Sequence, residues 1–72
     1  MLIYNVFGRP IGVLRVQERW LVFRADLTER EFSRLYDIII PDDLSEPDIS
    51  AWLTDIFHEA ATERYPDVRR IE

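Results

Sequence analysis

Apolar residues recur at alternate positions along the first third of the chain, a spacing typical of half-buried β-strands. Three such stretches cover residues 2–7, 11–16 and 20–24, with short breaks at 8–10 and 17–19. Glycine reaches positive φ easily and proline lacks a backbone donor, so the first break favours a turn. The pattern predicts three strands joined by short turns in an antiparallel meander.

The second turn allows two registers. A turn on residues 17–18 pairs Leu14 with Leu21, whereas a turn on residues 18–19 pairs Val16 with Leu21. Directly paired residues share a face of the sheet. Both registers therefore place the same four apolar residues together: Leu14, Val16, Leu21 and Phe23. We expect this face to be the core and to receive the C-terminal helix.

The opposite face of these strands is also apolar, which leaves its role open. Its residues are Ile11, Val13, Arg15, Trp20, Val22 and Arg24. If a second helix covers them, they form ordinary core. If both helices pack on the other side, an apolar patch with an arginine rim faces water, as at association surfaces. On this second interpretation the partner-binding residues are Val13, Arg15, Trp20, Val22 and Arg24.

Residues 28–36 carry a helix-start pattern followed by a strand-like run. Thr28 and Glu31 have the spacing of a capping box, which predicts a short helix. A competing interpretation makes residues 30–40 a strand, because apolar and polar side chains also alternate there. Residues 36–40 end in three isoleucines before a proline, and β-branching predicts a fourth strand over them.

The strongest local pattern starts the C-terminal helix. Ser45 is a good N-cap, and Pro47 fits the first turn because it needs no amide partner there. An apolar stripe with helical spacing follows: Ile49, Trp52, Leu53, Ile56, Phe57 and Ala60. We expect the helix to end near Glu63, before Pro66. Residues 67–72 either add a short strand or fray.

These elements predict an α+β fold in one domain over residues 1–72. The predicted sheet is a three- or four-stranded, mainly antiparallel β-meander. The long amphipathic helix packs on one of its faces, and a short helix precedes the fourth strand. There are no cysteines, which excludes disulfides and thiolate metal sites. No apolar run approaches the ~20 residues of a membrane span, so we expect a cytoplasmic protein without membrane partners.

Charge is distributed unevenly along the chain. The net charge is −5, and all nine basic residues are arginine. Residues 1–36 carry +2, whereas residues 37–72 carry −7. Such a dipolar chain can pair with a copy of itself or with charged partners, but the favoured interpretation of the acidic half is a solvated helix face.

The candidates for chemistry are few. His58 and Glu59 resemble the start of a zinc-protease helix motif, but position 62 is threonine where that motif needs a second histidine. Asp55, His58 and Glu59 still share one side of the helix, and a carboxylate beside an imidazole can bind a metal or share a proton. The alternative is a plain exposed surface. We expect no cofactor and no enzymatic activity, because no catalytic motif is present.

Two further functions remain as hypotheses. The first is a small protein-interaction module, with self-association as one option, that uses the sheet face around Trp20. The second is binding of single-stranded nucleic acid, with Arg15, Arg19, Arg24 and Trp20 as a stacking surface. The acids of the second half disfavour nucleic acid unless they lie on the far side of the domain.

A set of short motifs resembles a group of short uncharacterised bacterial proteins. The motifs are Phe7-Gly8-Arg9, Trp20, Ile40-Pro41, the run from Leu53 to Glu59 that reads LTDIFHE, and Pro66 followed by Val68-Arg69-Arg70. They extend over nearly the whole chain. The resemblance implies a bacterial protein and carries no activity or site residue with it.

Overall fold

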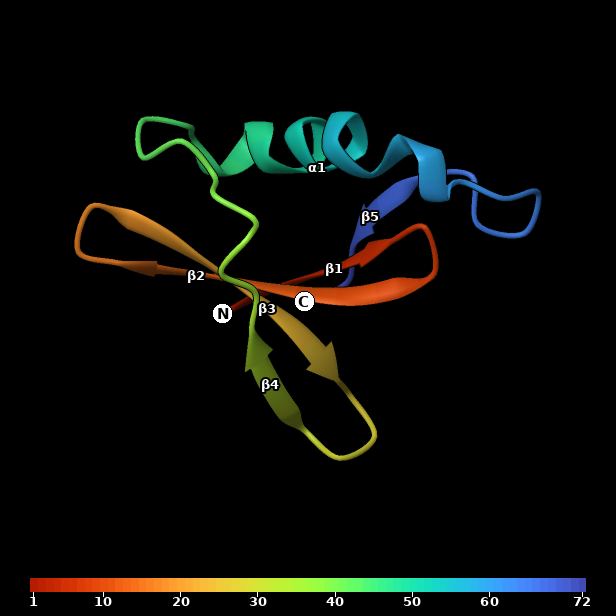
Figure 1. Cartoon of the computed structure of the whole chain (residues 1–72), viewed down its shortest axis with the longest axis horizontal. Coiled ribbons are helices and arrows are strands. Elements are labelled where there is room, and N and C mark those ends of the chain that lie inside the picture. The colour runs from red at the N-terminus through yellow and green to blue at the C-terminus, as the bar shows by residue number, and fades with distance from the viewer.

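The alternating segments at the start of the chain form the first three strands of a sheet, as predicted (Figure 1). The computed structural model describes all of residues 1–72. Five antiparallel strands lie in the order β4-β3-β2-β1-β5. Their bounds are Leu2–Val6 (β1), Arg9–Val16 (β2), Arg19–Asp26 (β3), Glu31–Arg34 (β4) and Val68–Arg70 (β5). The fold class is therefore α+β, with one strand more than the sequence predicted.

The turn between β1 and β2 is tight because its two central residues both take positive φ. Phe7 has φ 50° and Gly8 has φ 91°, the combination that two-residue hairpin turns favour. Gly8 also has no room for a side chain, since a Cβ there would lie 2.7 Å from Cδ2 of Tyr65. Its backbone N–H donates to Oδ1 of Asn5 at 2.7 Å. Glycine is thus required at this turn by both conformation and space.

The turn between β2 and β3 uses the first of the two predicted registers. Leu14 pairs with Leu21 and Val16 pairs with Arg19, so the turn lies on residues 17–18. Gln17 accommodates it with φ 55°. The prediction that Leu14, Val16, Leu21 and Phe23 share a face is also confirmed by this pairing.

The short helix predicted over 28–36 is absent, and that prediction was wrong. Oδ1 of Asp26 accepts the backbone N–H groups of Thr28 and Glu29, both at 3.0 Å, and so holds a turn in place of a helix start. The chain then pairs back on β3 as β4. The competing strand interpretation was nearer, although β4 ends at Arg34. Pairing with β3 satisfies the backbone over several residues, which one capping box cannot do.

The isoleucine run does not form the predicted fourth strand. Residues 35–40 contain no strand, and the run alternates sharply in burial. Ile40 is 1% exposed, whereas Ile39 is 76% exposed. The segment cannot continue along the sheet, because it carries the chain from the sheet to the helical layer (Figure 1). It therefore contributes Ile40 to the core as a single anchor.

The helical layer spans residues 46–60 and starts where the sequence predicted. It consists of a 3₁₀ turn at Glu46–Asp48, the helix α1 at Ile49–Phe57 and a 3₁₀ turn at His58–Ala60. Ser45 occupies the extended N-cap position, but its hydroxyl donates to Oδ2 of Asp48 at 2.7 Å and makes no bond to a backbone amide. The helix ends earlier than the predicted Glu63.

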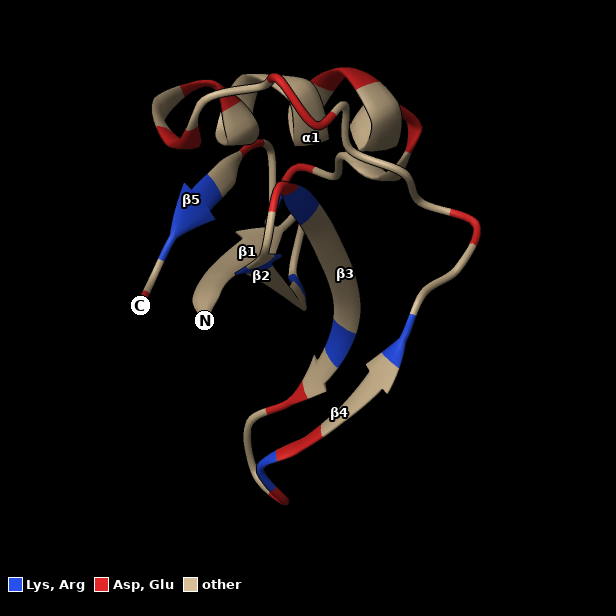
Figure 2. Ribbon diagram, turned by 90° about the vertical axis from the view of Figure 1, so that its left-hand side faces the viewer, with Lys and Arg blue, Asp and Glu red and all other residues tan.

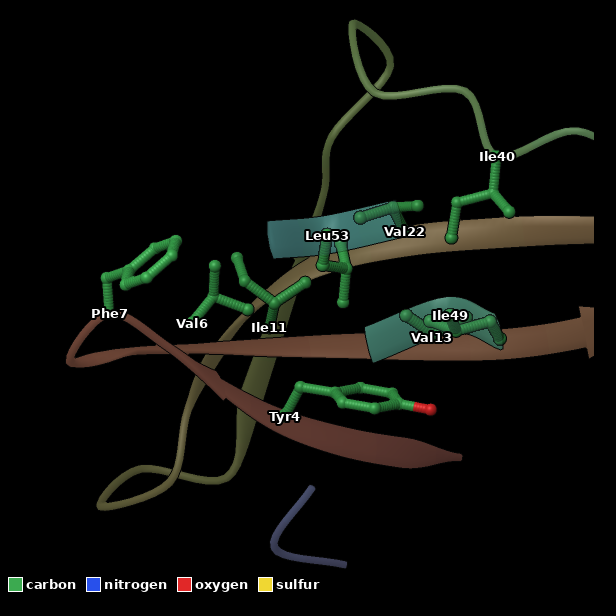
Figure 3. Packing of buried hydrophobic residues seen from close by; sticks show 9 residues of the cluster. All are labelled: Tyr4, Val6, Phe7, Ile11, Val13, Val22, Ile40, Ile49 and Leu53. Carbon is green, nitrogen blue, oxygen red and sulfur yellow. The ribbon is translucent and has the colours of Figure 1, made fainter. Parts of the chain in front are cut away.

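The core lies between α1 and one face of the sheet (Figure 3). Nine buried residues form it: Tyr4, Val6, Phe7, Ile11, Val13, Val22, Ile40, Ile49 and Leu53. Their strand members are those that pair with one another, so they share a face. This corrects the sequence interpretation: the helix packs on the face of Val13 and Val22, and the face predicted to be the core has no helix on it.

The C-terminal tail forms β5, the first of the two alternatives that the sequence left open for this segment. Val68 pairs with Val6 on β1, and the backbone N–H of Ile71 continues the pairing to the carbonyl of Ile3 at 2.8 Å. The helix α1 is too short to cross a membrane, and so is every other helical segment.

Candidate functional site

Two of the residues predicted to bind a partner are buried inside the chain. Val13 is fully buried and Val22 is 1% exposed, and both pack in the core against α1. Neither side chain is available to a partner in this arrangement. The sequence hypothesis of an interface around Trp20 therefore loses its two central aliphatic residues.

Trp20 lies at the margin of the same core and holds a loop in place. Its indole Nε1–H donates to the backbone carbonyl of Leu44 at 2.9 Å. Arg15 stacks on the ring, with Cζ 4.6 Å from the centroid, and its Nη1 donates to the carbonyl of Asp42 at 2.9 Å. Both side chains thus tie the loop before the helix to the sheet. The fifth predicted residue, Arg24, is exposed on this face and makes no ion pair within 4.0 Å.

The uncovered sheet face is the largest feature that no other element accounts for. We call it the open face. Figure 1 shows α1 on one side of the sheet and no helix on the other. Six of its apolar residues are half-buried or exposed: Leu14, Leu21, Phe23, Val16, Phe32 and Ile71. Val16 is 41% exposed and Phe32 is 40% exposed. Contiguous apolar surface of this kind marks an association site more often than a lone exposed side chain does.

The open face is curled at its edges. Nη1 of Arg30, in the turn between β3 and β4, lies 3.7 Å from a carboxylate oxygen of Glu72, which follows β5. β4 and β5 are the two edge strands of the sheet, so this ion pair connects segments next to its opposite edges. Ile3 and Ala25, which belong to the open face, are 4% and 5% exposed although no helix covers them. Burial on this face is therefore uneven: Ile3 and Ala25 are buried, whereas Val16 and Phe32 are exposed.

The charged groups within the strands of the open face are all arginine. Pairing places Arg19 opposite Val16, Arg34 opposite Phe23, and Arg69 opposite Asn5. The acids of the strands, Asp26 and Glu31, pair with each other on the other face. Residues 37–63 contain eight acids and no arginine or lysine, and Figure 2 shows red positions spread over the helical layer and its entry loop. The helical layer is therefore acidic, whereas arginine is found on both faces of the sheet, with Arg9, Arg15, Arg24 and Arg70 on the covered face.

A groove runs along the free part of the β3 edge, next to the open face. β4 pairs only with residues 23–26, so residues 19–22 have no strand beside them on this side. The groove has a volume of about 320 Å³ and lies between the β3 edge and the segment that follows β4. Tyr36 and Ile39 line it and are 75% and 76% exposed. Cζ of Arg34 lies 4.9 Å from the Tyr36 ring centroid and 5.9 Å from that of Phe23.

Backbone groups of β3 point into this groove without a partner. The last bond that β3 makes on this side is from the N–H of Leu35 to the carbonyl of Val22, at 2.8 Å. Groups of alternate residues in a strand point to the same edge, so the N–H and C=O of Trp20 also face the groove. No backbone or side-chain hydrogen bond of the structure reaches them from the loop side. This edge can accept a further extended segment.

The candidate acid–base group on the helix stays apart and solvated. Asp55, His58 and Glu59 are all exposed. The helix changes to 3₁₀ geometry at His58, whose Nδ1 lies 3.0 Å from the backbone carbonyl of Asp55 and so turns toward the backbone. No three His, Asp or Glu side chains of the chain are grouped closely enough to hold a metal ion. The arrangement adds no support to the metal or acid–base hypothesis.

Tyr4 is the one titratable group whose pKa the fold shifts clearly. Burial in the core raises the pKa of its phenol above the usual value of about 10. Nearby Arg70 opposes this effect, and Glu46 adds to it. The phenol lies between the sheet and α1 (Figure 3), where Tyr4 contributes to the packing of the core.

The sequence contained one signal that distinguishes the two faces, and it lies in β1. Pairing through the Phe7–Gly8 turn places Leu2, Tyr4 and Val6 on the covered face. The alternate residues of β1 include Asn5, which favours exposure. Extending the alternation from β2 and β3 to β1 would have identified the covered face. Nothing comparable reveals the free β3 edge, because that depends on where β4 ends.

Fold and site together define a small two-layer α+β domain with one open, basic and apolar sheet face. The family described as "Domain of unknown function (DUF7661)" matches residues 1–72, and the chain belongs to this family. This agrees with the resemblance to uncharacterised proteins at the level of the family. No curated protein matches the chain, and no solved structure does.

Proposed function

We propose that the protein is an interaction module that binds an extended, acidic and apolar segment of a partner protein on its open face. The observation that carries the proposal is the composition of that face, which combines exposed apolar side chains with arginine as its sole charged residue type within the strands. Phenylalanine, tyrosine and arginine are enriched in interface centres. Eight of the fourteen acids lie in residues 37–63, the helical layer and its entry loop, so most of the negative charge is not on this face.

The dimensions of the open face favour a narrow partner. Strands lie about 4.8 Å apart and rise about 3.3 Å per residue, so a face of these five strands covers roughly 440 Å². A standard interface between folded proteins buries about 800 Å² on each partner. The curl, bridged by Arg30 and Glu72, narrows the surface further. A single segment fits such a face better than a second globular surface does.

Charge disfavours a symmetric dimer through this face. A two-fold interface brings the same patch of both copies together, which would gather the arginines of both copies in one interface. An acidic segment removes that repulsion and speeds association. The unpaired N–H and C=O of Trp20 add main-chain bonds for a segment in extended conformation, as in strand addition to a sheet edge.

The test is selection of ligands from a random peptide library displayed on phage, with the whole chain as bait. We expect selected peptides to alternate apolar residues with aspartate or glutamate. Phe32→Ser and Arg34→Glu should each weaken their binding by about tenfold, because they remove an apolar contact or reverse a charge. Ile56→Ser is the matched control, since Ile56 is apolar and 51% exposed but lies on α1.

Several outcomes contradict the proposal. Selected peptides that are basic, or that bind Phe32→Ser as well as the wild type, would show that the open face is not the site. Tighter binding of a single-stranded oligonucleotide than of any acidic peptide would assign the face to nucleic acid instead. A dimer in sedimentation equilibrium that dissociates on Val16→Ser would assign it to self-association.

A further inference from the structure

The covered side of the sheet has a small pocket at the end of α1 that the proposed function does not use. Its volume is about 260 Å³. Four apolar side chains and three charged ones line it: Ile11, Leu35, Ile38, Phe57, Arg9, Arg24 and Asp37. Ligand sites in proteins are mostly apolar with a few polar groups, and occupy about 300–1,000 Å³. This pocket has that composition and lies just below that range in volume.

Two arginines without partners stand beside the pocket. Arg24 pairs with Ile11, and Arg9 lies two residues before Ile11 on the same face, so the two are diagonal neighbours. Such neighbours lie about 7–8 Å apart in a sheet. Neither guanidinium takes part in an ion pair, a hydrogen bond or a stacking contact, whereas Arg15, Arg30 and Arg70 all do. Both also line a wider hollow of about 660 Å³ together with Asp26, whose Oδ1 accepts the backbone N–H groups of Thr28 and Glu29.

We infer that this pocket binds a small monocarboxylate whose apolar chain or ring enters it. Guanidinium groups hold carboxylates through paired N–H donors, and an anion between Arg9 and Arg24 relieves the repulsion of two neighbouring like charges. The chain or ring then contacts Ile38 and Phe57. Asp37 at the pocket disfavours ligands with several negative charges, which favours a single carboxylate over a polyphosphate.

Isothermal titration and amide chemical-shift mapping with octanoate test this inference. We expect saturable binding, with the largest shifts at Ile11, Ile38 and Phe57. Arg9→Gln and Arg24→Gln should each weaken octanoate by about tenfold or more, since each removes a charged hydrogen bond. Arg19→Gln is the control, because Arg19 is also exposed and unpaired but lies outside this pocket, and it should change binding less than about twofold.

Two further probes separate charge from hydrophobicity. Octan-1-ol has the chain without the charge, and inorganic phosphate has charge without the chain, so both should bind at least about tenfold more weakly than octanoate. No octanoate binding at millimolar concentration overturns the inference. So does octan-1-ol or phosphate binding as tightly as octanoate, or octanoate binding that both glutamine variants leave unchanged. None of these results depends on the open face, so the outcome is separate from that of the proposed function.

Discussion

Val22 and Phe23 are adjacent on β3 and point to opposite faces of the sheet. Val22 is 1% exposed beneath α1, whereas Phe23 is half-buried on the open face. The two faces are similarly apolar along β2 and β3, and both carry arginine. Their roles nevertheless differ, because a single helix can cover only one of them. Apolar composition therefore does not by itself identify the core of a small domain.

Arg15 on the covered face and Arg19 on the open face show a similar difference, although Arg9 and Arg24 on the covered face are also unpaired. On the covered face, Arg15 stacks on Trp20 and bonds to the entry loop, so its charge serves the fold. On the open face, Arg19 makes no ion pair or hydrogen bond. A charge that the fold leaves unpaired remains available to a partner. The comparison can be tested by making equivalent changes on both sides.

The largest difference is expected from removing a leucine on each side. Leu53 of α1 is fully buried, so Leu53→Ala should lower the free energy of unfolding by about 2–5 kcal/mol through lost burial and a cavity. Leu21→Ala on the open face should cost about 1 kcal/mol, because the side chain is only half-buried. Urea unfolding followed by circular dichroism measures both. Equal costs would mean that the open face is as much core as the covered one.

A second pair of changes uses the same substitution twice on β2. Val13→Thr places a hydroxyl in the fully buried core and should cost about 1–3 kcal/mol. Val16→Thr, at a residue 41% exposed on the open face, should change stability by less than about 0.5 kcal/mol. Thermal unfolding of the two variants gives the difference. A larger cost at Val16 than at Val13 would reverse the assignment of the faces.

The two tryptophans sharpen the comparison at the margin of the core. Trp20→Phe keeps an aromatic ring but removes the donor to the Leu44 carbonyl, whereas the half-buried indole of Trp52 makes no hydrogen bond. Trp20→Phe should therefore cost about 0.5–1.5 kcal/mol more than Trp52→Phe. Chemical unfolding of both variants tests this. Equal losses would show that the bond to the loop contributes nothing to stability.

The smallest effect concerns Tyr4 and appears only at alkaline pH. Because burial raises its folded pKa above the unfolded value of about 10, the folded chain retains a proton that the unfolded chain loses. The stability that this contributes is complete below pH of about 10 and falls as the pH rises from there through the folded pKa. Tyr4→Phe should flatten this fall while changing stability at pH 7 by less than about 1 kcal/mol. Urea unfolding between pH 7 and pH 11 measures it, and an unchanged alkaline slope would contradict the assignment.

Features with a short-range cause could be predicted from the sequence. The helix start at Ser45 follows from cap and proline preferences, and the apolar stripe from Ile49 onward follows from helical spacing. The pairing of Leu14 with Leu21 was one of two registers that turn length allows. Each of these depends on residues only a few positions apart, where backbone geometry leaves few alternatives.

Residues 28–40 could not be predicted because competing local preferences were decided elsewhere. The capping box of Thr28 and Glu31 favours a helix, but Asp26 bonds to the backbone of the same turn, and β3 offers a free edge. Pairing with that edge prevailed for Glu31–Arg34. The isoleucines beyond it then had to cross between layers, where only Ile40 finds a place in the core.

By itself, the sequence determined the strand meander, the residues that share each face, and the start and apolar stripe of α1. Alternation and helical spacing set these locally, because neighbouring residues constrain the directions of side chains and hydrogen bonds. The tertiary structure decided which face α1 covers. That choice depends on the path of the chain from β4 to Ser45 and on β1 and β5, which the alternation of β2 and β3 does not contain. As a result, the face predicted to be an interface became the core. The face predicted to be the core, with Leu14, Val16, Leu21 and Phe23, is left where a partner can reach it.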